Sequence, residues 1–187
     1  IIETKRMLFS AVQRKYDLTD RQMFYIREKL KKYHEKDEWL VAIFNPDSMS
    51  KELWIYLEGV EWIRDVYLNF DVPYRKAEIN FVKKHIARLE NELGIHLDPL
   101  QIETGMTVDM LALYFNRSKT RIYNILSPYR KSHPHFFIDT NDSILSKEGI
   151  VYLEKHFFLD RYIQGLYLYK RFLQERKMLK NEKERRQ

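Results

Sequence analysis

The stretch that decides the fold is residues 107–126, which read TVDMLALYFNRSKTRIYNIL. Four small or apolar residues stand where two crossing helices would touch, namely Leu111, Ala112, Ile122 and Ile125. Asn116 lies between the two segments, and asparagine is one of the few residues besides glycine that tolerate a positive φ. Ser118 is a good helix N-cap. The stretch therefore predicts a helix, a tight turn and a second helix.

This pattern resembles the helix-turn-helix motif of DNA-binding proteins, although Arg117 stands where the motif usually has an apolar residue. The resemblance implies that the helix 118–126 enters a major groove. Base edges would meet Lys119, Thr120, Tyr123 and Asn124. Phosphates would meet Arg117, Arg121, Arg130 and Lys131, while Thr107 and Ser118 complete the expected DNA-binding site. An ordinary helical hairpin in an all-helical protein is the alternative.

The residues after this motif predict a β-hairpin and a long helix. Residues 135–138 and 144–145 read as two strands joined by the turn 139–142. A hairpin of this size in this place resembles the wing of a winged helix-turn-helix domain. Ser146 is expected to cap a long helix that reaches about Lys180 and ends in a basic tail.

The positive charge of the chain is concentrated with this motif. The formal net charge is +6, yet residues 1–106 contain 17 Lys and Arg against 18 Asp and Glu. Residues 107–187 contain 16 Lys and Arg against 9 Asp and Glu. A basic half beside a neutral half is typical of a nucleic-acid-binding module joined to a packing or partner module.

The first part of the chain also predicts helices. An apolar face with Leu8, Val12 and Tyr16 indicates the first helix, and Thr19 with Gln22 resembles a capping box for a second helix through Tyr33. Residues 39–44 predict a strand. Ser50 is expected to cap a further helix that runs to about Leu68.

Residues 74–93 predict a helix with a heptad seam formed by Ile79, Val82, Ile86, Leu89 and Leu93. The seam either packs in the core or forms a dimer contact, and the apolar side of the last helix is the other candidate interface. We expect a homodimer, since one reading helix covers few base pairs. The predicted domains are a helical lobe 1–94, a linker 95–106 and a winged helix-turn-helix lobe 107–187 with the long basic terminal helix.

The two halves of the chain look similar at an offset of 96. Residues 50–58 and 146–154 then share six of nine residues. This similarity suggests a tandem repeat of two winged-helix-like units, with coincidence as the alternative. In such a repeat the first copy is degenerate and has lost the basic face of the second, since it mixes Asp20, Glu28 and Glu35 with its basic residues.

Several classes of site find little support in the residues. The chain has no cysteine and five glycines, which disfavours thiolate sites and glycine-rich phosphate loops. His133, His135 and His156 lack a carboxylate pattern that would complete a metal site. Paired acids such as Glu58 with Glu61 are commoner on exposed helices than in catalysis. We therefore expect no enzyme, no metal and no cofactor.

The sequence thus predicts a mainly α-helical fold, with a helix-turn-helix, a short β-wing and a tandem winged-helix-like repeat as a further hypothesis. The expected function is sequence-specific binding of double-stranded DNA by a cytoplasmic transcriptional regulator. No apolar run approaches the roughly 18 residues of a membrane span, so no membrane partner is expected. A protein-interaction adaptor and a plasmid or phage replication or partition factor are the alternatives.

Overall fold

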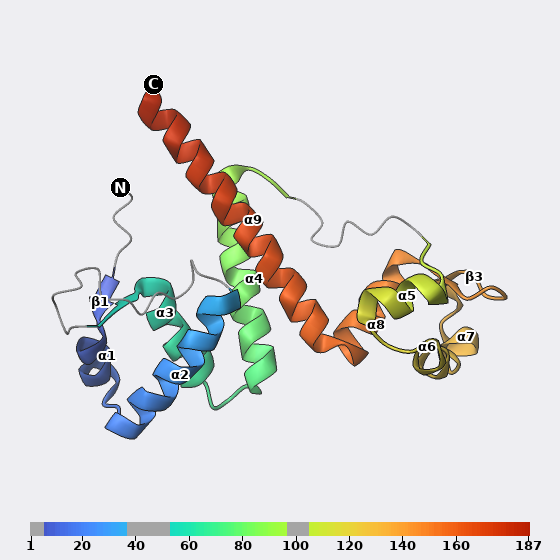
Figure 1. Cartoon of the computed structure of the whole chain (residues 1–187), viewed down its shortest axis with the longest axis horizontal. Coiled ribbons are helices and arrows are strands. Elements are labelled where there is room, and N and C mark those ends of the chain that lie inside the picture. Colours follow the sequence, from blue (N-terminus) through green and yellow to red (C-terminus); the bar gives the residue numbers. More distant parts are fainter. Residues whose placement is uncertain (1–5, 37–52, 97–104) are drawn as a thin grey trace. The chain divides into compact units, whose positions relative to one another are not determined.

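The computed structural model describes residues 6–36, 53–96 and 105–187 (Figure 1). The fold is mainly α-helical with two small antiparallel sheets, which confirms the predicted fold class. The chain packs as two units. Unit 1 is Ile1–His96 with Leu166–Gln187, and unit 2 is Leu97–Gly165. Sequence analysis assigned all of residues 107–187 to one lobe, whereas the last 22 residues pack with unit 1. Within the described ranges no helix combines the length and apolar content of a membrane span.

In unit 1, two strands from distant parts of the chain pair with each other. β1 (Arg6–Leu8) runs antiparallel to β2 (Trp54–Tyr56), with Met7 opposite Ile55. Between them lie α1 (Phe9–Tyr16) and α2 (Asp20–Lys36). After β2 come α3 (Leu57–Trp62), the π-helical turn η1 (Ile63–Tyr67) and α4 (Tyr74–Leu93). The final helix, α9 (Leu159–Arg186), contributes its residues from Leu166 onward to this unit.

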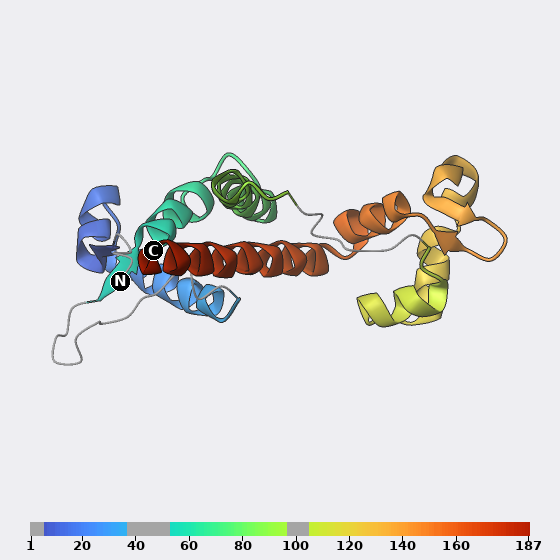
Figure 2. The ribbon, with the colours of Figure 1, turned by 90° about the horizontal axis from the view of Figure 1, so that it is seen from above.

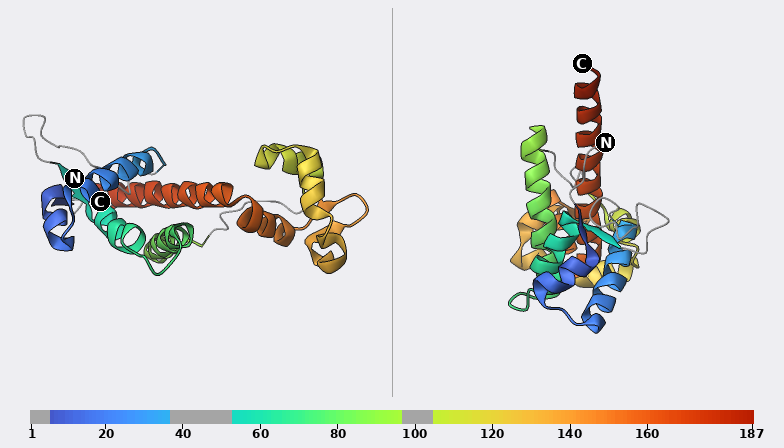
Figure 3. Two further views of the ribbon diagram at one scale, coloured as in Figure 1. Left: turned by 90° about the horizontal axis from the view of Figure 1, so that it is seen from below. Right: turned by 90° about the vertical axis from the view of Figure 1, so that its left-hand side faces the viewer.

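Charged side chains lie inside unit 1. Lys170 of α9 has no exposed surface, and its ammonium group donates to Glu58 Oε2 of α3 at 2.9 Å. The Tyr167 hydroxyl donates to the buried carboxylate of Glu78 on α4 at 3.2 Å. Figures 2 and 3 show this part of α9 running beside α4. The terminal helix is therefore held in unit 1 by polar contacts as well as by apolar packing.

The heptad seam of α4 faces the interior of the same unit. Val82, Ile86 and Leu89 are buried there, while Ile79 and Leu93 are partly exposed. The buried apolar residues of α9 in this unit, among them Leu166 and Leu173, are likewise part of the core. Both surfaces considered for a dimer contact are thus largely occupied, and homodimerisation itself stays a prediction.

Unit 2 contains the predicted helix-turn-helix and hairpin. Its elements are α5 (Val108–Phe115), α6 (Lys119–Leu126), α7 (Tyr129–Ser132), the 3-10 turn η2 (Pro134–Phe136), β3 (Phe137–Asp139), β4 (Ile144–Leu145) and α8 (Lys147–Phe157). Leu111, Ile122 and Leu145 meet in an apolar core. Met106 forms an isolated antiparallel bridge to Leu145. Helix α8 comes so close to η2 that a Cβ at Gly149 would clash with the Phe136 carbonyl oxygen.

The first helix and the turn that follows it have the same backbone in both units at an offset of 99 residues, although α2 is 17 residues long and α6 is 8. Helix α1 ends at Asp17 with φ 49°, and α5 ends at Asn116 with φ 52°. The Leu18 N–H donates to the Gln13 carbonyl at 3.0 Å, as the Arg117 N–H does to the Ala112 carbonyl at 2.9 Å. Unit 1 therefore contains a second helix-turn-helix.

The cap of the second helix is repeated at the same offset. In α2 the Gln22 N–H donates to Thr19 Oγ1 at 3.2 Å, and in α6 the Arg121 N–H donates to Ser118 Oγ at 3.3 Å. The Thr19 N–H also donates to Gln22 Oε1 at 2.9 Å, which confirms the predicted capping box.

The second halves of the two units match at an offset of 90, because the segment between the second helix and the following strand has a different length in each unit. Ile55 pairs with Met7 as Leu145 pairs with Met106, and a helix begins two residues after each. Glu58-Gly59-Val60 then corresponds to Glu148-Gly149-Ile150, with both glycines buried. In the described residues, both units have two helices, a strand and a further helix in this order, and unit 2 has α7, η2 and β3 in addition. The offset of 96 is wrong, since it sets strand β2 against helix α8.

Two predicted helices differ from the structure. The helix expected from Ser50 is a strand at Trp54–Tyr56 and becomes helical only at Leu57, because these β-favouring residues pair with β1. The helix expected from 147 to about 180 is two helices, broken at Phe158, whose ring stacks on Phe115 at 4.3 Å. Ser50, the predicted strand 39–44 and most of the predicted linker lie outside the described residues.

Candidate nucleic-acid interface

Asn116 sets the angle between α5 and α6. Its φ and ψ are 52° and 55°, the left-handed conformation expected at this turn. Its own N–H donates to the Leu113 carbonyl at 3.2 Å, which closes the end of α5. Thr107 caps the start of α5, because its hydroxyl accepts from the Met110 N–H at 3.3 Å. The predicted turn geometry is confirmed, and Thr107 has a structural role in it.

Helix α6 has a buried side and an exposed side. Ile122 and Leu126 are 0% and 1% exposed and pack in the core of unit 2. All of the predicted site residues from 118 to 124 are exposed, namely Ser118, Lys119, Thr120, Arg121, Tyr123 and Asn124. The prediction that these residues of α6 lie outside the core is therefore confirmed.

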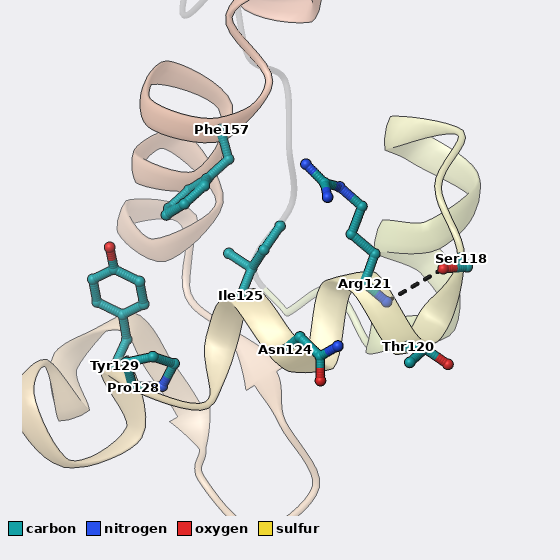
Figure 4. Close-up of a pocket in the computed structure, with 8 residues that line it drawn as sticks. All are labelled: Ser118, Thr120, Arg121, Asn124, Ile125, Pro128, Tyr129 and Phe157. Carbon is teal, nitrogen blue, oxygen red and sulfur yellow. Dashed lines mark hydrogen bonds between the residues drawn. The ribbon is translucent and has the colours of Figure 1, made fainter.

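A hollow of about 510 Å³ lies along α6. Its lining residues are Ser118, Thr120, Arg121, Asn124, Ile125, Pro128, Tyr129 and Phe157 (Figure 4). Arg121 and Ile125 project toward the side on which Phe157 lies, whereas Asn124 projects from the opposite side of α6 in this view. Phe157 of α8 is 39% exposed and therefore lies outside the core of unit 2. No pattern in the sequence pointed to this contribution from α8.

Two of the predicted cationic residues near the turn have contacts within the unit. The Arg117 guanidinium donates to the Asn116 carbonyl at 3.0 Å and lies 5.7 Å from the centre of the Phe158 ring. The Lys119 ammonium lies 2.7 Å from Asp109 Oδ1, and the hydrogen bond and charge of that carboxylate raise the pKa of Lys119. Both Lys119 and Asp109 are largely exposed, so this ion pair is weak and easily exchanged for another anion.

The hairpin is tied to α7 by a predicted phosphate contact. Arg130 donates from its guanidinium to Ser143 Oγ at 2.6 Å, and Ser143 is 2% exposed. The turn of the hairpin is an Asx turn, in which Asp139 Oδ1 accepts from the Asn141 N–H at 2.9 Å. Arg130 thus holds the hairpin in place, while Lys131 is exposed. Of the four predicted phosphate-binding residues, Arg117, Arg121 and Lys131 are exposed, and Arg130 is half-buried.

Among the described residues of unit 2, one acidic side chain is buried. Glu154 is 1% exposed, and its Oε1 accepts from the Tyr114 hydroxyl at 3.2 Å. Burial raises the pKa of Glu154, against the opposing effects of Tyr114 and Arg161. The Arg161 guanidinium lies 4.6 Å from the centre of the Tyr114 ring. Glu154 and Arg161 thus contact Tyr114 of α5, away from the exposed side of α6.

Comparison with known proteins adds no assignment: no family model, no curated protein and no solved structure matches the chain. The functional argument therefore depends on the geometry of the two units and on the chemistry of their exposed side chains.

Proposed function

We propose that unit 2 binds double-stranded DNA sequence-specifically, with α6 in the major groove, as a transcriptional regulator would. The observation that carries the proposal is the exposed side of α6, where hydrogen-bonding side chains stand on a helix fixed by a left-handed turn and an N-cap. A major groove admits one α-helix, and its base edges present donors and acceptors that such side chains match.

The residues divide into two roles under this proposal. Thr120, Tyr123 and Asn124 face base edges, and Arg121, Lys119 and Lys131 contact phosphates. Arg130 acts indirectly, because its bond to Ser143 holds the hairpin beside α6. The hairpin then flanks the groove as a wing. Phosphate contacts supply affinity and register, while the base contacts supply specificity.

The test begins with selection of bound duplexes from a random pool by the full chain. Affinity for the selected duplex is then measured against salt concentration, since each phosphate contact contributes about −0.9 to the logarithmic slope. Arg121→Glu is expected to weaken binding strongly and to reduce the slope by about 1. Lys183→Glu is the matched control, because it makes the same charge change on an exposed residue in the last turn of α9.

A selected consensus that depends on Arg121 and not on Lys183 supports the proposal. Selection of no sequence, together with no binding at low salt, contradicts it and favours the protein-interaction adaptor. Clustered repeats in the bound sites would favour the replication or partition factor over the regulator.

A further inference from the structure

We propose that α2 of unit 1 is a second DNA-recognition helix, so that one chain contains two DNA-binding motifs. This inference rests on the proposed function of α6 and extends it to a part of the chain that sequence analysis treated as a degenerate copy. It is carried by three observations, which concern the backbone, the exposed side chains and the charge.

The backbone of α1 and α2 repeats that of α5 and α6 through the turn and the cap, as the bonds of Leu18 and Gln22 show. Leu18 is 7% exposed and occupies the position of Arg117. An apolar residue there is the usual choice in the helix-turn-helix motif. In this respect the motif of unit 1 is the more regular of the two.

The exposed side of α2 presents side chains suited to a groove. Met23, Ile26 and Leu30 are buried on one side, whereas Phe24 and Tyr25 are 59% and 47% exposed on the other. These two aromatic residues correspond to Tyr123 and Asn124 at the offset of 99. Large exposed aromatic side chains that contribute little to a core are a sign of a binding surface.

The chemistry of this side matches base edges and not only phosphates. Phenylalanine makes apolar contact with the methyl group of thymine, and arginine is the commonest partner of guanine in the major groove. Arg21 is exposed at the position of Thr120, and its guanidinium lies 5.8 Å from the centre of the Tyr25 ring. Arg21, Phe24 and Tyr25 therefore form a compact reading set on the first turns of α2.

The charge of the two motifs is alike. Over residues 9–32 the exposed basic residues are Arg14, Lys15, Arg21, Lys29, Lys31 and Lys32, against exposed Asp17, Asp20 and Glu28. Over residues 108–131 they are Arg117, Lys119, Arg121 and Lys131, against exposed Asp109. Each motif thus exposes three more basic than acidic residues, and the acidic residues of α2 do not remove its affinity for a polyanion.

The experiment compares two matched double variants of the full chain, Arg21→Glu/Tyr25→Ala in α2 and Arg121→Glu/Asn124→Ala in α6. All four positions are exposed, so both variants should keep the far-ultraviolet circular dichroism and thermal transition of the wild type. Each variant and the wild type is taken through selection of bound duplexes. The wild type is expected to select two blocks of conserved bases, and each variant to lose a different block with a fall in affinity of about tenfold or more.

A second measurement tests Phe24 without any change of charge. Replacement of thymine by deoxyuridine within the block assigned to α2 removes only the methyl group. We expect this to weaken binding by the wild type and to leave binding by Phe24→Ala unchanged. An equal loss for both proteins contradicts the role of Phe24.

The outcomes separate this inference from the proposed function. If the α2 variant keeps the wild-type consensus, affinity and salt slope while the α6 variant loses them, α2 is not a second recognition helix, and the proposed function of α6 stands. Loss of self-association without loss of DNA binding in the α2 variant would make α2 a protein-docking helix and also overturn the inference. Selection of no sequence by the wild type overturns the proposed function itself.

Discussion

The two units share a helix pair with the same turn and the same N-cap, but the residues buried in their interiors differ. Unit 1 buries charged and ionisable side chains, with Glu78, His85 and Lys170 each at most 2% exposed. Unit 2 buries mainly apolar and aromatic residues, and Glu154 is the charged residue of its described part that is buried. The shared part is set by local signals, a left-handed residue and a capped second helix, which do not depend on what fills the core.

This comparison suggests that a helix-turn-helix can be kept while the core residues packed against it change, as long as the turn between its helices is retained. Unit 1 gains its polar interior from α4 and α9, which have no counterpart in the core of unit 2. The exposed sides of α2 and α6 are then free to differ in detail, with aromatic residues on one and mainly polar residues on the other. Substitutions in the interior and in the turn of each unit can show whether the two contribute independently to its stability.

The largest effect is expected from Glu58→Gln in unit 1. This change removes the carboxylate that lies 2.9 Å from the fully buried Lys170 ammonium. The Glu58 side chain is 29% exposed, but the charge that loses its partner, Lys170, is fully buried. Removal of the partner of a buried charge is strongly destabilising, so unit 1 should lose about 3 kcal/mol of unfolding free energy. Urea unfolding followed by tryptophan fluorescence measures this, since all three tryptophans of the chain lie in unit 1.

The matched control for that prediction is Glu28→Gln. Glu28 pairs with Lys31 at 3.1 Å, but their side chains are 47% and 56% exposed. An exposed pair contributes less than about 1 kcal/mol, so the control should unfold almost as the wild type does. Similar losses for Glu58→Gln and Glu28→Gln would show that the buried charges do not stabilise unit 1.

Acid should weaken unit 1 through His85. Burial, followed by the positive charges of Lys170, Arg88 and Lys84, lowers the pKa of His85 from 6.5 to about 3. This holds although carboxylate oxygens of Glu58 and Glu61 lie 3.8 and 3.2 Å from its ring nitrogens, because burial outweighs them.

The sign of the effect follows from proton binding. Below pH 6.5 the unfolded chain binds a proton at His85 that the folded unit does not, so stability is lost as the pH falls. Between about pH 6.5 and 4.5 the loss should reach about 2 kcal/mol, and His85→Gln should remove it. In unit 2 the raised pKa of Glu154 acts in the opposite direction, since acid relieves the cost of its buried charge. Tryptophan fluorescence and hydrogen exchange of residues 107–157 would follow the two units separately.

A third prediction concerns the close approach of Gly149 to the Phe136 backbone in unit 2. Gly149→Ala would place a Cβ against the Phe136 carbonyl oxygen and should destabilise unit 2 by about 2 kcal/mol. Gly165→Ala is the control, because nothing lies within 4 Å of its Cβ position in α9 and alanine favours helix. If hydrogen exchange in unit 2 is as slow in Gly149→Ala as in the control, the contact with Phe136 is not restrictive.

Sequence reasoning succeeded where the signal was local. Asn116, Ser118 and Ser146 were assigned to the turn and the caps that the structure has, and α4 runs over the predicted residues 74–93. It failed where a distant contact decides the conformation. Trp54 is in a strand because Leu8 lies opposite it, and the helix breaks at Phe158, whose ring stacks on Phe115.

The candidate site shows the same limit. Exposure of the α6 residues follows from helical periodicity, and it was predicted. The contact of Arg117 with the Phe158 ring and the hydrogen bond of Arg130 to Ser143 involve residues that no local pattern connects with these arginines. The repeat was predicted at the wrong offset, because the two units correspond at an offset of 99 before the strand and of 90 after it, whereas the six identities at the single offset of 96 are a coincidence.

The smallest expected effect tests the shared turn itself. Asp17 and Asn116 both have a positive φ, which costs alanine about 1 kcal/mol relative to glycine. We expect Asp17→Ala to destabilise unit 1 and Asn116→Ala to destabilise unit 2 by about that amount, while the glycine variants keep or improve stability. Lys15→Ala and Leu113→Ala are exposed helical controls that should stay within about 0.5 kcal/mol of the wild type. If only one of the two turn positions responds, the turns are not equivalent in energy, and the common backbone would reflect packing in one unit and local preference in the other.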